Sequence, residues 1–287
     1  MIVGIIGLGL IGGSLGRAIL DKTEHTVYGR DTDKGALLKA KMLNALHEEL
    51  TDDRLPSVDL LVLAVNPRVA VSLLPTLVPY LKKGATVIDC CGNKRLVVQK
   101  MEELRAVYPD VGFLGAHPMA GREYSGVEHS TSHLFEHSFV ILTPVHSSIA
   151  DFEKVKSLFL SVGCDGVQLA TAEEHDKMIS YTSQLAHVLS SSYVKCPLSA
   201  NHAGFSAGSF RDLTRVAKLN PSMWTELFVD NADNLTERIQ ELIDRLEEYK
   251  EAIEQKDEPR LRALLQAGTD AKLVAENALK AKRKEEK

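Results

Sequence analysis

Cysteines, aromatic residues and long apolar runs are all scarce in this 287-residue chain. The four cysteines (Cys90, Cys91, Cys164 and Cys196) show no C-x-x-C spacing, so we expect reduced thiols and no disulfide framework. No apolar run approaches the roughly 18 residues that a membrane-spanning helix needs. The N-terminus lacks the basic start of a signal peptide, and glycines interrupt its apolar stretch. The sequence therefore predicts a cytoplasmic protein without a membrane segment.

An excess of positive charge is also absent. The chain has 34 Lys and Arg residues against 39 Asp and Glu residues, a formal net charge of -5. This balance gives no general electrostatic reason to expect nucleic acid binding. The composition, 44% hydrophobic and 25% charged, is typical of a globular chain. Its length suggests about two domains.

The first seventeen residues, MIVGIIGLGLIGGSLGR, carry the strongest local signal. An apolar run over residues 2–6 predicts a buried strand, and apolar residues at helical spacing follow the glycines. The spacing G-x-G-x-x-G between them is that of a dinucleotide-binding turn, in which the helix N-terminus holds phosphates. Such glycines also occur in turns that bind nothing, but the strand before and the helix after favour a cofactor. The predicted cofactor-binding residues are Gly7, Gly9, Leu10, Ile11 and Gly12.

The choice between NAD and NADP depends on two adjacent residues. Asp31 lies 19 positions after Gly12, where an acidic residue binds the adenosine ribose. Arg30 precedes it and could instead serve the 2′-phosphate of NADP. Neighbouring strand residues point to opposite faces, so only one of the two should reach the ribose. Because a carboxylate repels a phosphate, we favour Asp31, and with it NAD over NADP.

Apolar runs alternate with helical patterns up to about residue 170. We expect strands at 25–29, 59–65, 85–90, 112–115 and 138–142, and helices at 34–46, 67–81 and 94–108. This alternation predicts an α/β fold with a Rossmann-like, doubly wound parallel sheet. A capping box at Thr171 and Glu174 then begins an all-α region, which we expect to be interrupted at 257–259 and at Gly268. The predicted domains are 1–170, binding the dinucleotide, and 171–287, helical.

The segment GAHPMAG (residues 115–121) follows a predicted strand and contains His117. A histidine at the carboxyl edge of a parallel sheet is suited to accept a proton from a substrate hydroxyl near neutral pH. An equally good interpretation is a structural histidine that binds loop carbonyls.

The helical region contains a polar stripe formed by Ser180, Gln184, His187 and Ser191. At this spacing the stripe either faces solvent or lines a polar cavity. A second stripe is expected to pack in the core: Met178, Tyr181, Leu185 and Val188.

Further along, Arg211 and Arg215 flank Asp212, which makes this segment a candidate anion clamp or a structural ion pair. Trp224, the only tryptophan, is either a core residue or the wall of a substrate pocket. His129, His133 and His137 recur at every fourth position. Their segment is rich in Ser and Thr and lacks a sustained helical pattern, so we expect a surface loop and no metal.

Five motifs together resemble one enzyme family over nearly the whole chain. GLGLIGGS, GAHPMAG, the helix containing SQLAH, FRDLTRVA and PSMW occur in the order found in prephenate and arogenate dehydrogenases. The resemblance implies NAD-dependent oxidative decarboxylation of prephenate to 4-hydroxyphenylpyruvate, in tyrosine biosynthesis. No β-α-β-β-α-β pattern occurs in the helical tail, so we expect a form without the regulatory ACT domain of many relatives.

The resemblance also assigns roles to residues. His117 is similar to the catalytic histidine and His187 to a second active-site histidine of the helical domain. Arg215 resembles the arginine that binds a substrate carboxylate, and Trp224 and Gln184 are expected at the substrate. The family often has a serine that contacts the catalytic histidine where this chain has Asn93, whose amide could orient the imidazole instead. We expect a homodimer through the helical domain, because its apolar stripes are too extended to be buried within one copy.

Three other functions remain open from the sequence. The substrate could be arogenate, or both cyclohexadienyl compounds could be used. A β-hydroxyacid-type dehydrogenase would need a catalytic lysine on the first helix of the second domain, where Lys177 is available. A non-catalytic NAD-binding protein is the third alternative, against which the intact His117 and Arg215 argue.

Overall fold

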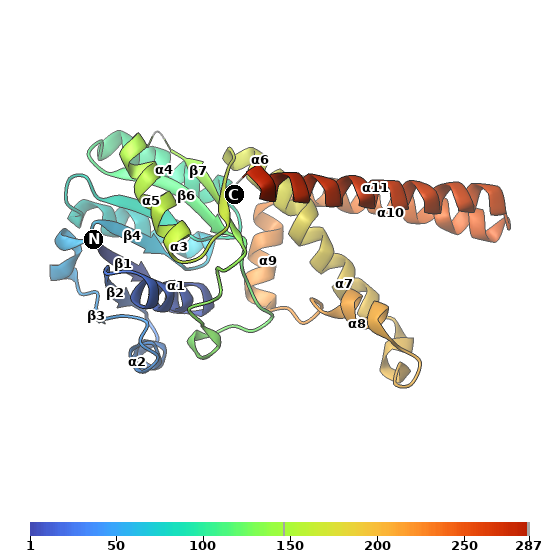
Figure 1. Cartoon of the computed structure of the whole chain (residues 1–287), viewed down its shortest axis with the longest axis horizontal. Helices are drawn as coiled ribbons and strands as arrows, with labels where there is room; N and C mark the ends of the chain where they lie inside the picture. Colours follow the sequence, from blue (N-terminus) through green and yellow to red (C-terminus); the bar gives the residue numbers. More distant parts are fainter. Residues whose placement is uncertain (146, 286–287) are drawn as a thin grey trace. The chain divides into compact units, whose positions relative to one another are not determined.

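The computed structural model describes residues 1–145 and 147–285 and contains an eight-stranded sheet (Figure 1). The strand order is β3-β2-β1-β4-β5-β6-β7-β8, so the chain reverses its direction of winding between β1 and β4. In open sheets of this kind the ligand binds at such a reversal, beyond the carboxyl ends of the strands. The strands are β1 (Ile2–Ile6), β2 (Thr26–Arg30), β3 (Glu48–Glu49), β4 (Leu60–Leu63), β5 (Thr86–Asp89), β6 (Gly112–Pro118), β7 (Phe139–Pro144) and β8 (Gly166–Leu169).

The Rossmann-like fold is confirmed, with one correction to strand direction. β1 to β6 are parallel, but β7 runs antiparallel to β6, and β8 is parallel to β7. The segment between β6 and β7 contains no α-helix, and an antiparallel neighbour needs no helical crossover. The sheet is therefore mixed at this edge. The short strands β3 and β8 were not expected from the sequence.

Helices cover both faces of the sheet, and the sheet separates two apolar cores. One core joins the sheet to α1, α2 and α5, and the other joins it to α3 and α4. The bounds are α1 (Leu10–Lys22), α2 (Lys34–Met42), α3 (Pro67–Leu77), α4 (Arg95–Val107) and α5 (Ile149–Ser161). The predicted helices at 34–46 and 67–81 are thus shorter than expected, and α5 had not been expected.

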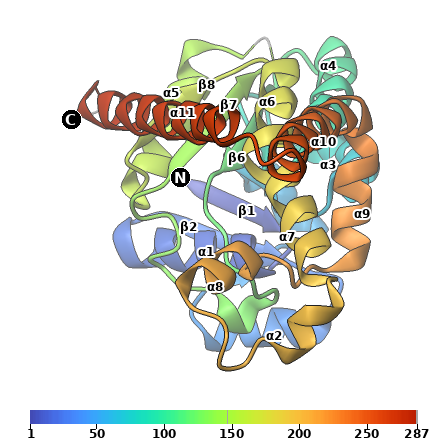
Figure 2. The ribbon, with the colours of Figure 1, turned by 90° about the vertical axis from the view of Figure 1, so that its right-hand side faces the viewer.

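Four helices and a π-helical turn follow the sheet: α6 (Ala172–Ile179), the π turn (Ser180–Leu185), α7 (Ala186–Val194), α8 (Gly208–Thr214) and α9 (Pro221–Asp230). The capping box that begins α6 is present, because Thr171 Oγ1 accepts from the Glu174 N–H at 3.1 Å and the Glu174 carboxylate accepts from the Thr171 N–H at 2.9 Å. Figure 2 shows these helices grouped in front of the sheet.

The predicted core face of this helical segment is wrong at Met178 and Tyr181, although Leu185 of the same stripe is buried. Met178 and Tyr181 are 58% and 60% exposed, whereas Ser180 and Gln184 of the polar stripe are buried. The π turn changes the angular spacing between α6 and α7, so α-helical periodicity does not extend through it. The Gln184 side chain points into the interior because two buried amides, those of Asn93 and Asn231, form hydrogen bonds with it.

The chain forms two compact units that divide after Asn231. The first contains the sheet and α1 to α9. The second contains α10 (Ala232–Glu254) and α11 (Glu258–Glu285), joined by hydrogen bonds such as Tyr249 Oη to the Leu264 carbonyl at 3.1 Å. The predicted interruption near 257–259 is present, but Gly268 lies inside α11 and interrupts nothing. None of the helices in the described residues combines the length and apolar character needed to cross a membrane.

Candidate active site

The glycine turn after β1 has the shape that a dinucleotide requires. Gly7 has a φ of +88°, and a Cβ there would lie 2.5 Å from the Ala64 carbonyl oxygen. A Cβ on Gly12 would lie 1.9 Å from the Gly7 oxygen, whereas one on Gly9 meets nothing within 4 Å. α1 begins at Leu10, so its first N–H groups, from Leu10 to Gly12, have no partner within the helix. Gly9 thus leaves open space beside an anion-binding helix end, as a pyrophosphate needs.

Asp31 and Arg30 point to different surroundings at the end of β2. The Asp31 carboxylate accepts from the Leu8 N–H at 2.7 Å, which places it against the glycine turn. The Arg30 guanidinium instead donates to the Leu50 carbonyl at 2.6 Å and to Asp52 at 2.7 Å. Asp31 lies where it can bind a ribose hydroxyl, and Arg30 is already bound to other groups. This arrangement suits the ribose of NAD, which has no 2′-phosphate.

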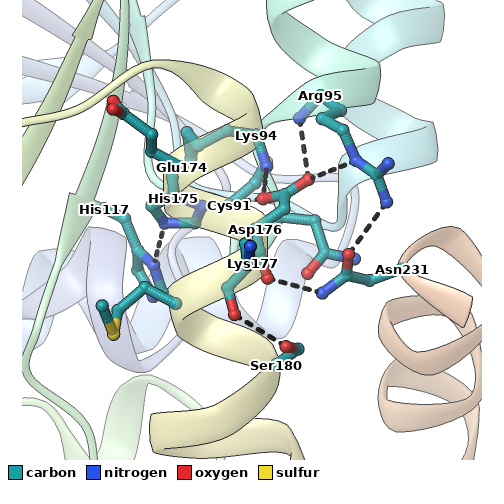
Figure 3. Close-up of polar contacts among 12 residues, drawn as sticks. Cys91, Lys94, Arg95, His117, Glu174, His175, Asp176, Lys177, Ser180 and Asn231 are labelled. Carbon is teal, nitrogen blue, oxygen red and sulfur yellow. Dashed lines mark hydrogen bonds and ion pairs between the residues drawn. The ribbon is translucent and has the colours of Figure 1, made fainter. Parts of the chain in front are cut away.

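His117 lies near the carboxyl end of β6 and is joined to a histidine on α6 (Figure 3). The distance from His117 Nδ1 to His175 Nε2 is 2.8 Å, and that from His175 Nδ1 to Asp176 Oδ1 is 2.7 Å. His117 remains partly exposed, but His175 is 1% and Asp176 0% exposed. The three side chains form a continuous chain from the interior to one accessible imidazole.

The Asp176 carboxylate is fixed by the start of α4. It accepts from the Lys94 N–H at 2.7 Å, from the Arg95 N–H at 3.0 Å and from Arg95 Nε at 3.3 Å. Asn231 Nδ2 donates to the Asp176 carbonyl at 2.9 Å. Burial alone would raise the pKa of Asp176, but the bonds from His175 and from the Arg95 and Lys94 amides outweigh it and lower the pKa. Asp176 is therefore an ionised carboxylate.

A buried ion pair lies behind the same group. Lys94 Nζ binds the Asp89 carboxylate, and both side chains are 0% exposed. Lys94 Nζ also donates to the Ala116 carbonyl at 2.7 Å, directly before His117. Burial, together with the charges of His175 and Lys94, holds the pKa of His117 well below its ordinary 6.5. Burial and Lys94 also lower the pKa of His175, although its bond to Asp176 opposes this. Both imidazoles are therefore neutral at neutral pH.

Lys94, His175 and Asp176 were missed by the sequence analysis. Lys94 directly follows Asn93, and His175 lies four residues after the predicted N-cap Thr171, so the capping box was the only nearby signal. Their proximity depends on α6 docking at the ends of β5 and β6, which no local pattern encodes.

The predicted roles of Asn93 and Gln184 need correction. Asn93 does not contact His117: its Nδ2 donates to the Leu227 carbonyl at 2.8 Å, and its Oδ1 accepts from Gln184 Nε2 at 2.9 Å. Gln184 Oε1 accepts from Asn231 Nδ2 at 2.8 Å. Asn93 and Gln184 are each 1% exposed, so these amides join the π turn and α9 to the loop between β5 and α4 rather than facing a substrate.

His187 and Trp224 lie side by side, a contact that the sequence did not predict. Their ring centroids are 3.9 Å apart, and Trp224 also contacts Phe228 at 5.3 Å. His187 Nδ1 lies 2.8 Å from the Ser183 carbonyl, which can only accept, so His187 carries its proton on Nδ1. Burial lowers the pKa of His187, and the Ser183 bond opposes this. Trp224 is partly exposed, so it is not a core residue.

Arg215 forms an ion pair with Glu123, six residues after His117. This pair links α8 to the loop after β6, and the Arg215 charge also acts on His187. The Arg215 side chain is 63% exposed. Arg211 lies 3.5 Å from Asp212, so the structural ion pair proposed from sequence involves Arg211 and leaves Arg215 for other partners.

Two further candidates from the sequence are Lys177 and the histidines spaced four residues apart. Lys177, on which a β-hydroxyacid mechanism would depend, is an exposed residue of α6. His133 contacts Glu136 at 2.8 Å and His137 lies 3.4 Å from Asp165. Within the described ranges, no group of three or more His, Cys, Asp or Glu side chains could hold a metal ion.

Comparison with known families identifies both parts of the chain. Residues 15–167 match the family model "Prephenate dehydrogenase, nucleotide-binding domain", and residues 171–267 match "Prephenate dehydrogenase, dimerization domain". The chain belongs to the prephenate dehydrogenase family. The first match begins just after the glycine turn, so that turn is an independent indication of nucleotide binding.

Individual relatives agree with this assignment. A cyclohexadienyl dehydrogenase of Zymomonas mobilis is 32% identical, and the alignment covers 89% of each chain. A prephenate dehydrogenase of Bacillus subtilis is 30% identical over 88% of this chain and 70% of the relative. The solved structure of A. aeolicus prephenate dehydrogenase, in complex with hydroxyphenyl propionate and NAD⁺, has a TM-score of 0.85 and 27% identity, covering 96% of this chain and 98% of that one.

Proposed function

We propose that this chain catalyses the NAD-dependent oxidative decarboxylation of prephenate to 4-hydroxyphenylpyruvate, a step of tyrosine biosynthesis. One observation carries the proposal: a neutral, partly exposed histidine at the carboxyl edge of the sheet, held from behind by buried partners. The glycine turn with Asp31 lies at this same edge, because β1, β2 and β6 are parallel strands of one sheet. A base and a dinucleotide site thus share one side of the fold.

The cofactor would be held by the glycine turn. The N–H groups of Leu10, Ile11 and Gly12 would bind the pyrophosphate and Asp31 the ribose, which favours NAD over NADP. When bound, NAD accepts a hydride at C4 of its nicotinamide ring. The complex of the A. aeolicus relative with NAD⁺ supports this choice.

The role of His117 follows from the chemistry of the substrate. As hydride leaves the ring carbon that bears the hydroxyl, His117 accepts the hydroxyl proton, and the carbon becomes a carbonyl carbon. Loss of the ring carboxylate as carbon dioxide leaves its bonding electrons in the ring, which becomes aromatic. The oxygen is then a phenolate, and His117 returns the proton to it. Atoms and charge balance with no net proton released.

The second half of the site would bind the rest of the substrate. Arg215 is proposed to hold a carboxylate, since a guanidinium offers a planar pair of donors. Its present partner Glu123 is a partly exposed carboxylate, and exposed ion pairs contribute only about 0–1 kcal/mol, so a substrate carboxylate can compete for Arg215. Trp224, stacked on His187, would provide an apolar wall beside the ring.

Prephenate is our first choice among the cyclohexadienyl substrates, and arogenate the alternative. The Bacillus relative carries the name prephenate dehydrogenase, and the Zymomonas relative is named for the wider substrate class. The substrates differ in a keto or an amino group on the side chain.

We also propose a homodimer in the cytoplasm. Residues 171–267 match a model described as a dimerization domain. Both units carry large apolar side chains on their helical surfaces, among them Tyr181 (60% exposed) and Phe205 (94%) in the first unit and Leu265 (57%) and Val274 (70%) in the second. Light scattering of the purified chain should give twice the monomer mass; a monomer at micromolar concentration would contradict the proposal.

The proposed function is tested by measuring NADH and carbon dioxide together. Prephenate and arogenate are each supplied with NAD and with NADP. We expect equal amounts of the two products from prephenate, a higher kcat/KM for prephenate than for arogenate, and NAD preferred over NADP. NADH without carbon dioxide, or no NADH from either substrate, would overturn the assignment.

A further inference from the structure

The chain of contacts behind His117 bears on which of its nitrogens carries a proton. His117 Nδ1 faces His175 Nε2, and His175 Nδ1 faces the Asp176 carboxylate (Figure 3). One nitrogen of a neutral imidazole donates and the other accepts, so each contact in such a chain restricts the next. The far end of the chain is fixed, because a carboxylate can only accept.

The direction of both hydrogen bonds follows from Asp176. Since its Oδ1 accepts, His175 must carry a proton on Nδ1, and its Nε2 is then a bare acceptor when the ring is neutral. His117 must therefore donate from Nδ1. This leaves its Nε2 without a proton. The alternative is a doubly protonated His175 that donates at both ends.

Three features exclude that alternative. His175 is 1% exposed, so a charge on it would be poorly solvated. The ammonium of Lys94 disfavours a further positive charge on either imidazole, and although the Asp176 and Asp89 carboxylates oppose this at His175, burial and Lys94 outweigh them and lower its pKa. The ionised Asp176 carboxylate also accepts three N–H donors from Lys94 and Arg95, one of them the Arg95 guanidinium, so its negative charge is shared among several partners and not held for an imidazolium alone.

We propose that Asp176 and His175 are positioning residues that lock His117 in the tautomer with Nδ1 protonated and Nε2 free to act as the base. This inference rests on the proposed function for its catalytic meaning, but the tautomer itself is a property of the protein alone. In the reaction, the substrate hydroxyl proton moves to His117 Nε2. The resulting imidazolium keeps its Nδ1–H bond to His175, and no proton needs to pass along the chain.

As in a catalytic triad, a buried carboxylate here determines which nitrogen of the catalytic histidine is protonated. The difference is that His175 lies between the Asp176 carboxylate and the base His117. In serine proteases the aspartate sets the tautomer of the histidine, and its loss lowers turnover by about 10⁴-fold because the wrong nitrogen is protonated. Here the carboxylate acts through one further imidazole. Lys94 and Arg95 fix the carboxylate, so the orientation is defined by backbone amides at the start of α4.

The first test is a nitrogen NMR measurement on the full-length parent protein labelled with ¹⁵N-histidine, with and without NAD. His117→Asn assigns the His117 signals by their loss. We expect His117 to show a protonated Nδ1 and an unprotonated Nε2 at neutral pH, and His175 to show the same pattern. A proton on His117 Nε2 would overturn the proposal, whatever the activity of the enzyme.

The second test compares two substitutions at His175. In His175→Asn the amide can still bind Asp176 but is too short to reach His117, so we expect kcat to fall about 100-fold with KM nearly unchanged. In His175→Gln the longer side chain can place its oxygen at His117 Nδ1, so part of the activity should return. The matched control is His133→Asn at an exposed histidine that pairs with Glu136, where kcat should not change.

The outcomes separate this inference from the proposed function. If His175→Asn keeps the parent kcat and the His117 tautomer, the positioning role is wrong. If the parent makes no NADH from prephenate while the tautomer is as expected, the proposed function fails and the hydrogen-bond chain stands. If the parent is active and His117 carries its proton on Nε2, the inference alone fails. The NMR result on the parent decides the case where a variant does not fold.

Discussion

The two halves of the proposed site differ in how their polar groups are held. Around His117, the side chains of Lys94, His175 and Asp176 are 0–1% exposed and each has fixed partners. Around Arg215, the guanidinium is 63% exposed and pairs with a carboxylate that is itself 34% exposed. Hydrogen bonds in a dry interior are strong and directional, whereas exposed ion pairs exchange at little cost. The comparison suggests that the chemistry is preorganised and that substrate binding relies on exchangeable contacts.

Removing the base should have the largest effect. We expect His117→Asn to lower kcat for prephenate by roughly 100-fold or more, the scale of losing a general base, with NAD affinity retained. Steady-state kinetics and NAD titration measure the two quantities. His137→Asn, at a site 87% exposed, serves as the control and should behave as the parent. Parent-level turnover in the His117→Asn variant would show that the buried half of the site does not supply the base.

Removing the arginine should instead raise KM. Arg215→Ala loses charge-assisted hydrogen bonds of about 1.5–3 kcal/mol, which corresponds to a KM increase of roughly 10- to 150-fold, with kcat affected less. Arg211→Ala is the matched control, because Arg211 pairs with Asp212 on the same helix. An unchanged KM in Arg215→Ala, or an equal rise in both variants, would remove Arg215 from the substrate site.

The buried amides beside the base should matter for stability rather than catalysis. Gln184→Ala removes the partner of Asn93 and Asn231, and leaving buried polar groups unpaired costs about 1–3 kcal/mol. We expect that loss in the free energy of unfolding, measured by denaturant titration, while KM stays at the parent value. The control Gln240→Ala, on the exposed side of α10, should cost less than about 0.5 kcal/mol. A large KM change with normal stability would restore Gln184 as a substrate ligand.

The smallest expected effect is that of pH. Burial and the nearby His175 and Lys94 lower the pKa of His117, so its neutral form is lost only as the pH falls through that lowered value. We therefore expect kcat/KM for prephenate to vary by less than about twofold between pH 6.5 and about 8 and to fall only at more acid pH. An acid limb centred at or above 6.5 would show that His117 is not held in this environment.

Local sequence signals predicted the parts of the molecule that depend on neighbours in sequence. The glycine turn, the Thr171 capping box and the placement of His117 at the end of a strand all follow from such patterns. The direction of β7 could not be predicted, because a short apolar run carries no information on strand orientation. The π turn likewise shifted a helical face that α-helical periodicity had assigned to the core.

The errors within the site have a common physical cause. Asn93 and Gln184 were assigned to catalysis and substrate through the family resemblance of their motifs, yet their amides bind one another in the interior. His175 and Asp176 were missed because their partners lie 58 and 82 residues away, on β6 and before α4. Which polar groups meet is decided by how α6 docks on the sheet, and a single sequence does not reveal that docking.

The most direct test of the account is kcat at saturating prephenate and NAD for the parent, His117→Asn and Arg215→Ala. A preorganised base and an exchangeable carboxylate contact predict a kcat for Arg215→Ala close to that of the parent, and one for His117→Asn lower by roughly 100-fold or more. Equal losses in the two variants, or turnover of prephenate that is independent of His117, would contradict it.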